Sequence, residues 1–398
     1  MDLKTRLEQL RPRNGAQAVP IRNGNLGARL SRLQVRKKAS NPDCPPMTEG
    51  ELADRLGGRL LEKGVLLIEQ RVPLSDIHGD FALETIRQEH LVLPGTQDIC
   101  ADQLLFMDTE TTGLSGGSGT LVFLLGVGRL EGRELVLRQY LLTSFSGEAP
   151  LLTSAGAWLR ENETLVSYNG KSFDVPLLAT RGRMAGVPDP FSKMPHLDLL
   201  HPLRRGFRER WPSCRLANAE RNLIGFHRQN DLPGAEAPAA WFEWVRHREW
   251  RRLSGVLEHN RLDLISLAAL LPLLCRAYRE PWRWEADIGA IARGWLMAGR
   301  PDIALKMLER GRAGLSHRGL MELARLWRNL GEWQRACEVW WLLSNAGNDA
   351  ATEQLAKYHE HVIRDIETAL WLSGRLTDSE GSRRRHRRLT GKLSAVSS

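Results

Sequence analysis

The sequence predicts an α/β domain, with a mixed sheet flanked by helices, followed by an all-α region of helical repeats. Over residues 101–278, short apolar segments alternate with helical patterns, which is typical of α/β folds. Two of these apolar segments are separated only by a short turn at Glu131-Gly132, so we expect them to pair antiparallel. Residues 285–376 read as helical throughout and repeat weakly about every 32–33 residues, which indicates stacked helices.

The first hundred residues divide into an arm and a small preface. Residues 1–46 lack hydrophobic periodicity and end in a Pro-rich break, so we expect a disordered basic arm. Residues 47–100 are expected to form a small preface with a helix and strands. The helix is opened by Thr48 with Glu51 three residues later, which is a capping-box pattern. The strand GVLLIEQRVP ends at Pro73.

The domain at 101–278 carries the predicted sheet. Five strands are expected, with the sequences LLFMD, TLVFLLGVGRL, RELVLRQYLLT, TLVSYN and HLDLL. Helices are expected over about 149–160, directly after Asp174, and through most of 213–275. The chain therefore runs from one strand through an antiparallel pair and a helix to a strand that we expect to lie parallel to the first.

Three segments of the C-terminal region align as a repeat: AGRPDIAL, NLGEWQRAC and VIRDIETAL. In each, a residue precedes an alanine by five positions: Gly299 before Ala304, Gly331 before Ala336 and Arg364 before Ala369. A small alanine lets paired helices approach closely, so we expect tetratricopeptide-like hairpins over 285–376, which could bind a protein partner or serve only for packing. Residues 377–398 are expected to form a basic disordered tail.

The net charge of +9 lies mainly at the two ends of the chain. Residues 1–40 hold ten Lys/Arg and two acids, and residues 375–398 hold seven and two, so the remaining body carries −4. Basic tails attract nucleic acid because they neutralise phosphates and release counterions. Solvated, disordered ends have the same composition. Single-stranded DNA or RNA is therefore a candidate partner that the charge alone does not establish.

Composition also excludes several classes of protein. The longest apolar run, at residues 121–127, is too short to span a bilayer, and the charged N-terminus lacks the apolar core of a secretory signal. The five cysteines lie far apart with no CxxC pair, so neither a zinc site nor a disulfide framework is expected. We expect a cytoplasmic protein without membrane contact.

The segment DTETTG places two carboxylates, Asp108 and Glu110, at the end of an apolar strand. Residues two apart on an extended chain point to the same side. Two like charges this close are costly unless a cation lies between them. Taken alone, the segment is better explained as a solvated strand end before a glycine turn.

Two further segments add acidic residues on helices. Asp174 follows YNGKSF and opens a helix, where the helix dipole alone also favours an acid. His259 and Asp263 are four residues apart and share one face of a helix that continues into the apolar LISLAALLPLL. Taken alone, that pair is better explained as a surface His–Asp pair. Together, the three segments indicate one site.

These segments resemble those of DEDD 3′–5′ exonucleases, and most closely those of the YprB-type ribonuclease H-like family, whose sheet has the strand order predicted above. The resemblance covers about residues 50–275, on the motifs LADRLGG, DTETTGL, YNGKSFDVPLL, HLDLLHP, CRLANAERNLIGFHR, NDLPGAEAP and LEHNRLDLISL. The catalytic residues that it implies are Asp108, Glu110, Asp174, His259 and Asp263. The gap between His259 and Asp263 is four residues, whereas His-type DEDD enzymes usually have five, so the general-base role of His259 is left open.

The resemblance implies a metal-dependent 3′–5′ exonuclease that acts on single-stranded nucleic acid by a two-metal mechanism. The implied ligands of two Mg²⁺ or Mn²⁺ ions are Asp108, Glu110, Asp174 and Asp263. His259 is expected to orient or deprotonate the attacking water. The expected substrate contacts are Thr109, Asn169 and Phe173. The alternative is a non-catalytic ribonuclease H-like module that binds nucleic acid or protein on a helical-repeat scaffold. The complete set of carboxylates favours the enzyme.

Overall fold

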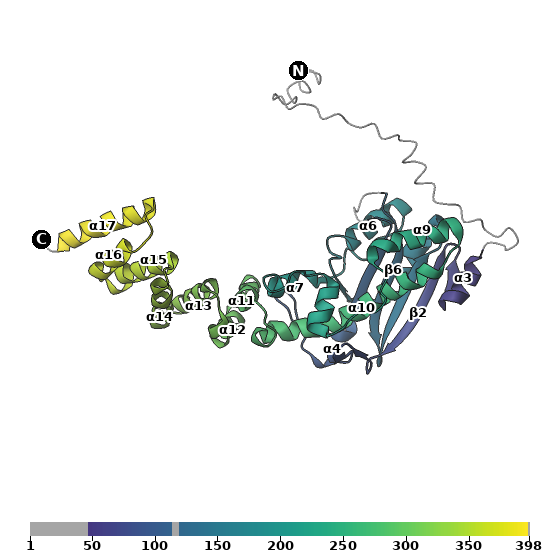
Figure 1. Ribbon diagram of the computed structural model, residues 1–398, viewed down its shortest axis with the longest axis horizontal. Coiled ribbons are helices and arrows are strands. Elements are labelled where there is room, and N and C mark those ends of the chain that lie inside the picture. Colours follow the sequence, from purple (N-terminus) through teal and green to yellow (C-terminus); the bar gives the residue numbers. More distant parts are fainter. Residues whose placement is uncertain (1–46, 114–118, 397–398) are drawn as a thin grey trace, which may run out of the picture. The chain divides into compact units, whose positions relative to one another are not determined.

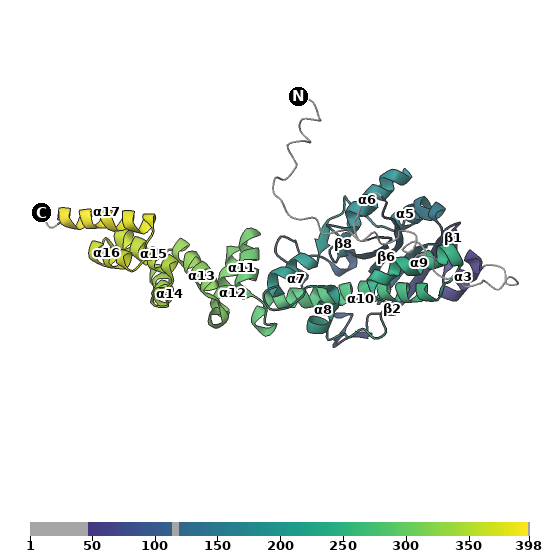
Figure 2. The ribbon, with the colours of Figure 1, turned by 45° about the horizontal axis from the view of Figure 1, so that its top comes forward.

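The computed structural model describes residues 47–113 and 119–396. Within these residues, seven strands form one mixed sheet in the order β1-β2-β7-β6-β5-β8-β9. Figures 1 and 2 show this sheet with the helices that lie beside it. The strands are β1 (Arg59–Glu62), β2 (Val65–Pro73), β5 (Leu104–Thr111), β6 (Val122–Glu131), β7 (Glu134–Leu142), β8 (Thr164–Ser167) and β9 (His196–Asp198). The short strands β3 (Ile77–His78) and β4 (Phe81–Ala82) form a separate pair. The predicted α/β class is confirmed.

The centre of the sheet is the hairpin of β6 and β7. These strands pair antiparallel from Leu124↔Leu141 to Glu131↔Glu134, which confirms the predicted pairing and turn. On the other side of β6 lies β5, which is antiparallel to β6 and parallel to β8. Because β8 and β9 are also parallel, the carboxyl ends of β5, β8 and β9 lie at the same edge of the sheet.

The N-terminal preface is joined to this sheet. β2 pairs with β7 over its whole length, from Val65↔Leu142 to Pro73↔Glu134. Ahead of it, α3 (Glu49–Leu56) begins with the predicted capping box, in which the Thr48 and Glu51 side chains each bond the other's backbone. From the sequence, residues 47–100 were predicted to be separate from the domain at 101–278. A local pattern does not reveal that the partner of β2 is β7, which lies far along the chain.

Helices pack on the sheet and contribute to its core. They are α4 (Thr85–Gln88), α5 (Glu148–Gly156), α6 (Asp174–Ala185), α7 (Leu200–Phe207), α8 (Leu216–Ala219), α9 (Ala237–His247) and α10 (Arg251–Arg279). On β5, Leu104 and Phe106 share a hydrophobic cluster with the second half of α10, whereas Leu105 and Met107 share another with α5 and α6. Asp108 and Glu110 continue the series of Leu104 and Phe106, so the strand directs both carboxylates toward α10.

The described residues beyond α10 form helices joined by short turns, which confirms the predicted all-α region (Figure 1). The helices are α11 (Ile288–Met297), α12 (Pro301–Arg310), α13 (His317–Asn329), α14 (Trp333–Asn345), α15 (Asp349–Tyr358), α16 (Ile366–Gly374) and α17 (Glu380–Val396). The turns between α11 and α12, α13 and α14, and α15 and α16 have left-handed residues at Gly299 (φ 74°), Gly331 (φ 82°) and Arg364 (φ 64°). The repeat alanines Ala304, Ala336 and Ala369 are all fully buried. These hairpins follow the predicted repeat, and their likeness to tetratricopeptide units stays a prediction.

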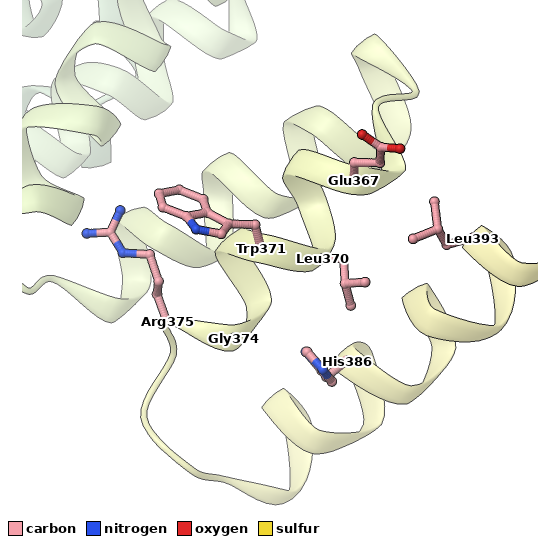
Figure 3. Close-up of a pocket in the computed structure, with 7 residues that line it drawn as sticks. All are labelled: Glu367, Leu370, Trp371, Gly374, Arg375, His386 and Leu393. Carbon is pink, nitrogen blue, oxygen red and sulfur yellow. The ribbon is translucent and has the colours of Figure 1, made fainter.

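The C-terminal segment differs from the sequence expectation. Disorder was expected over 377–398, but residues 380–396 form α17. The helix is attached by Leu389, which is fully buried, and by Arg388 and Lys392, which both bond the buried carboxylate of Glu360. A charge count shows seven cations but not that some of them have carboxylate partners on neighbouring helices. A shallow hollow lies between α16 and α17 (Figure 3), lined by Glu367, Leu370, Trp371, Gly374, Arg375, His386 and Leu393.

Three further expectations concern the ends of the chain and its cysteines. The expected disordered arm at 1–46 lies outside the described residues. Over the described parts of the chain, no helix is long and apolar enough to cross a membrane. The cysteines at positions 100, 214, 275 and 337 are free thiols, and Cys44 lies in the undescribed arm.

Candidate active site

Asp108 lies on β5 opposite Gly126 of β6 and is held by Asn260 of α10. A Cβ at Gly126 would lie 2.2 Å from Oδ1 of Asn260, so only glycine leaves room for that side chain. The fully buried Asn260 donates from Nδ2 to Oδ2 of Asp108 at 2.8 Å and to the Asp108 carbonyl at 3.2 Å. Its own Oδ1 accepts from Nε2 of Gln139 at 2.9 Å. This chain of amides fixes the rotamer of Asp108 and bonds one of its two carboxylate oxygens.

Asp174 begins α6 and faces the end of β5. Its Oδ1 accepts a hydrogen bond from the hydroxyl of Thr109. The loop that precedes it is held by the buried Asp198 at the end of β9, which accepts from the backbone N–H groups of Asn169 at 2.7 Å and Lys171 at 3.1 Å. The carboxyl ends of the three parallel strands therefore meet around Asp174.

α10 brings His259 and Asp263 to the same place. Nε2 of His259 lies 3.8 Å from Oε1 of Glu110 and 3.8 Å from Oδ2 of Asp263. A spacing of one helical turn is therefore enough to present both α10 side chains to the carboxylates of β5. The structure thus brings together the five residues that the sequence predicted as catalytic.

Burial makes the carboxyl groups of this cluster weaker acids. Burial raises the pKa of Asp108 well above its ordinary value, and repulsion from the other three carboxylates adds to the shift. Burial likewise raises the pKa of Glu110 to about 8, against the attraction of His259, and the pKa of Asp174 to about 6. Buried acids that raise each other's pKa indicate a cluster that its neighbouring cations do not fully neutralise, a pattern that is common at functional sites.

One cation already lies against this cluster. Arg228, in the loop after η3 (Glu220–Ile224), donates from Nη2 to Oδ1 of Asp263 and from Nη1 to Oδ2 of Asp231 at 3.2 Å. Burial lowers the pKa of Arg228, but its bonds to Glu220 and the charge of Asp263 outweigh burial and raise it. Oδ1 of Asp231 lies 2.7 Å from Nδ1 of His259. Arg228 and Asp231 therefore contact residues of the predicted catalytic set.

The three predicted substrate contacts lie beside Asp174. The Thr109 hydroxyl is engaged by Asp174, so in this structure it orients that carboxylate. Asn169 has a left-handed backbone with φ 69°, which asparagine tolerates better than most residues. Phe173 is 54% exposed, although phenylalanine is usually buried. An exposed ring next to the cluster is suited to stacking on a base. Contact of these residues with a substrate stays a prediction.

The donor set suits a hard divalent cation, because carboxylate oxygens are the ligands that Mg²⁺ and Mn²⁺ prefer. As the side chains lie, however, no three His, Cys, Asp or Glu side chains within residues 47–113 and 119–396 are placed to hold a metal ion together. The Arg228 guanidinium occupies Oδ1 of Asp263. A metal at this cluster would therefore use Oδ2 of Asp263 or displace the arginine. The chemistry of the donors fits a metal, and their geometry requires a local adjustment.

Sequence reasoning missed several residues that orient this cluster: Asp198, Glu220, Arg228, Asp231 and Asn260. All of them lie in motifs that carry the family resemblance, and no role had been assigned to them. No local signal distinguished them: Asn260, for example, stands among other polar and charged residues at 258–263 of α10, so its full burial could not be inferred from the sequence. Their partners lie at distant positions of the chain, so only the folded structure identifies them.

Comparisons with known proteins agree with this fold. A family model described as RNase_H superfamily matches residues 105–275. The chain is 32% identical over 371 residues to the uncharacterized protein YprB of Bacillus subtilis (strain 168), a match that covers 85% of this chain and 87% of that protein. A structure of the family B DNA polymerase from the hyperthermophilic archaeon Pyrobaculum calidifontis is similar over 50% of this chain but only 29% of the polymerase, with 16% identity and a TM-score of 0.32. A likeness at that level supports no further inference.

Proposed function

Because the chain belongs to the YprB-type ribonuclease H-like family, we propose that it is a metal-dependent 3′–5′ exonuclease that hydrolyses phosphodiester bonds of single-stranded nucleic acid. The observation that carries the proposal is the carboxylate cluster around His259, at the shared edge of β5, β8 and β9 and against α10. Several carboxylates that are buried together with raised pKa values are typical of functional sites. The proposed metal ligands are Asp108, Glu110, Asp174 and Asp263.

In this reaction, His259 acts as the general base through Nε2. It takes a proton from a water molecule, and the resulting hydroxide oxygen bonds to phosphorus. The bond from phosphorus to the 3′ oxygen of the penultimate nucleotide breaks, and that oxygen keeps the electron pair and gains a proton from solvent. The products are a nucleoside 5′-monophosphate and a strand shorter by one residue. Phe173 stacks on the terminal base, and Asn169 and Thr109 contact its sugar.

Ribonuclease H-like nucleases generally use divalent metals. Two Mg²⁺ or Mn²⁺ ions held by the carboxylates would neutralise the scissile phosphate and help to ionise the water. Asn260 supports this arrangement, because its bond to Oδ2 of Asp108 fixes the orientation of that carboxylate. Thr109 does the same for Asp174 by holding Oδ1.

The test uses the full-length protein with single-stranded DNA and RNA, labelled at the 3′ or the 5′ end, in Mg²⁺, in Mn²⁺ or in EDTA. The 3′ label is expected to leave as a mononucleotide at once, whereas the 5′-labelled strand should shorten stepwise, and EDTA should stop both. Asp108→Asn should reduce the rate by roughly 10²–10³-fold or more, the usual effect of losing one electrostatic group at a transition state. The matched control is Asp102→Asn, which changes an exposed acid just before β5 and should keep full activity.

The competing function is a non-catalytic module that binds nucleic acid or protein without hydrolysis. One observation favours it, namely the Arg228 guanidinium that already neutralises Asp263. Under that alternative, neither metal releases mononucleotides from DNA or RNA, and Asp108→Asn binds strands as tightly as the parent protein. Cleavage that persists in Asp108→Asn would also contradict the proposed site. A protein partner at the helical hairpins is compatible with either function.

A further inference from the structure

A chain of buried and half-buried polar side chains leads to His259 from the segment between α7 and α9. It starts at Glu220, which is 1% exposed and begins the π-helical turn η3. Arg228 donates to both oxygens of Glu220, from Nε at 2.8 Å and from Nη2 at 2.5 Å. The hydroxyl of Ser266 on α10 donates to the same carboxylate at 2.6 Å. A bidentate pair with a buried carboxylate fixes the plane of the guanidinium.

Arg228 in turn fixes Asp231. Its Nη1 donates to Oδ2 of Asp231 at 3.2 Å, and the other oxygen of that carboxylate, Oδ1, lies 2.7 Å from Nδ1 of His259. Each oxygen of Asp231 therefore has its own partner. The order of contacts from the interior to the proposed active site is Glu220, Arg228, Asp231 and His259.

These contacts select one tautomer of His259. Nδ1 also lies 3.3 Å from Nη1 of Arg228, but a guanidinium can only donate and a carboxylate can only accept. Nδ1 cannot serve both neighbours. Because the contact with Asp231 is much shorter, Nδ1 carries the proton and donates it to Asp231. The lone pair of the neutral ring is then on Nε2, which faces Glu110 and Asp263.

We propose that Asp231, locked by Arg228 and Glu220, is a positioning residue that keeps Nε2 of His259 free to accept a proton. The inference rests on the proposed function, in which His259 is the general base. It assigns a role to the motifs CRLANAERNLIGFHR and NDLPGAEAP. It also makes the four-residue gap between His259 and Asp263 less important, because Asp231, which lies outside α10, sets the orientation of the His259 ring.

The substitution Asp231→Asn tests this role because Arg228 dictates how the new amide must lie. Arg228 needs an acceptor, so the amide oxygen takes the place of Oδ2. The amide nitrogen then faces Nδ1 of His259 as a donor, and Nδ1 has to be unprotonated. The proton of the neutral ring moves to Nε2, which can no longer accept one. The variant keeps the shape of the site and reverses the tautomer.

The experiment measures the tautomer by long-range ¹H–¹⁵N correlation on full-length protein labelled with ¹⁵N in its histidine rings, in EDTA and at alkaline pH, where the ring is neutral. The His259 signals are assigned by their loss in His259→Gln. We expect an Nδ1–H ring in the parent protein and an Nε2–H ring in Asp231→Asn. The control Glu258→Gln changes the exposed neighbour of His259, which pairs with Arg261, and should leave the parent tautomer. Asp231→Ala provides a second variant and should give a mixture of tautomers.

An Nε2–H ring in the parent protein, or the parent tautomer in both Asp231 variants, overturns the inference. The activity arm uses single strands with Mn²⁺, where Asp231→Asn should lower kcat by roughly 10²-fold or more with little change in KM, because general bases contribute about 10²–10⁴-fold. The two failures are distinguishable. If the tautomer changes as expected but the protein has no nuclease activity, the proposed function is rejected and the positioning role of Asp231 stands. If the protein is an active nuclease but the tautomer does not change in the Asp231 variants, only the positioning role is rejected.

Discussion

Asp108 combines two opposed influences at the scale of a single residue. The amide of Asn260 bonds its carboxylate and favours the ionised form, while burial and three neighbouring carboxylates disfavour that form. The second influence wins, because burial raises the pKa well above the ordinary value. A residue that folding alone selected would not keep this conflict, since asparagine has the same shape without the charge. We therefore expect the site to trade stability for chemistry.

The metal-free protein should lose stability as the pH rises. Each carboxyl group of the cluster has a folded-state pKa above its unfolded one, as at Glu110 (about 8) and Asp174 (about 6), and the pKa of His259 is raised as well because Asp263 and Asp231 outweigh its burial. The folded state therefore binds more protons than the unfolded state, and stability that is present at about pH 4 is lost as the pH approaches about 8. We expect the free energy of unfolding to fall by a few kcal/mol in order of magnitude over this pH range, as measured by denaturant unfolding in EDTA.

Asp108→Asn should flatten that pH profile and raise the free energy of unfolding above pH 7 or so, by roughly 1–2 kcal/mol, because one buried charge and its repulsions are removed. Asp102→Asn, whose side chain is exposed, should leave the profile unchanged. Added Mg²⁺ or Mn²⁺ should stabilise the parent protein and not Asp108→Asn, because a ligand that binds only the folded state shifts the unfolding equilibrium. A parent protein more stable at pH 9 than at pH 5 in EDTA would contradict the electrostatic account.

At the scale of elements, the site depends on how closely α10 approaches β6. Gly126 allows Asn260 to lie between helix and sheet, and Gln139 of β7 completes the bonds of that amide. The proposed catalytic residues of α10 are placed by this contact, since His259 and Asn260 are adjacent. A central strand that contains glycine is weaker as a strand, but here it permits a polar residue of the helix to reach the carboxylate.

Gly126→Ala should therefore damage both stability and the site. The new Cβ would lie 2.2 Å from Oδ1 and 2.8 Å from Nδ2 of Asn260, so the helix has to move or the amide has to leave Asp108. We expect a destabilisation of about 1–3 kcal/mol, as for overpacked cores, measured by denaturant unfolding, together with loss of hydrolysis. The matched control is Gly50→Ala, where the nearest atom lies 3.9 Å away. If the two variants have equal free energies of unfolding, the close contact between Gly126 and Asn260 does not contribute to stability.

Among the helical hairpins, Arg364 holds the turn position that glycine holds at residues 299 and 331. A side chain costs about 1–2 kcal/mol in this left-handed conformation. Because Arg364 is exposed, Arg364→Gly should slow hydrogen exchange of the amides in α15 and α16 by relieving that strain. Gly331→Ala, which meets no atom within 4 Å but has φ 82°, should speed exchange in α13 and α14 by a similar factor. Faster exchange in Arg364→Gly would mean that the arginine side chain stabilises its turn.

At the scale of the whole molecule, charge is separated along the sequence, with a body near neutrality and two basic ends. The fold modifies this picture at one end, because α17 directs Arg388 and Lys392 to Glu360 and leaves Arg387 exposed. Cations that already have carboxylate partners contribute less to binding phosphates. The N-terminal arm has a net charge of +8 over residues 1–40, so we expect it to contribute more than α17 to binding nucleic acid.

Replacing the arm cations Arg36, Lys37 and Lys38 with glutamine should weaken binding of single strands and make its salt dependence shallower. For single strands, each phosphate contact contributes about 0.7 to the slope of log K against log salt concentration. Removing three cations should therefore lower that slope by at most about 2. The comparison variant replaces Arg383, Arg384 and Arg387 of α17, of which the first two pair with Asp378 and Glu380, and should have a smaller effect. Filter-binding isotherms at several salt concentrations measure both slopes, and an unchanged slope in the arm variant rejects a role for the arm in binding.

The sequence by itself was sufficient for most of the strands and helices between residues 101 and 376, though not for α17, and its motifs pointed through the family resemblance to the five proposed catalytic side chains. Apolar strands, the capping box at Thr48, the turn at Gly132 and the helical hairpins are encoded by residues close to one another, so local physics predicts them. The shared direction of Asp108 and Glu110 could be predicted because alternation along a strand is a local rule, whereas their place in the catalytic set came from the family resemblance. The roles of these residues as metal ligands and base still await the experiments above.

Only the tertiary structure decided which groups surround those side chains. Asn260 bonds Asp108, Asp231 contacts His259, and Arg228 bonds Asp263. Burial determines how strongly the pKa values of the carboxyl groups rise. The pairing of β2 with the main sheet and the packing of α17 against α16 were also revealed only by the tertiary structure. Contacts between distant positions depend on how whole elements pack, whereas a local pattern records only the preference of each segment for strand, helix or turn.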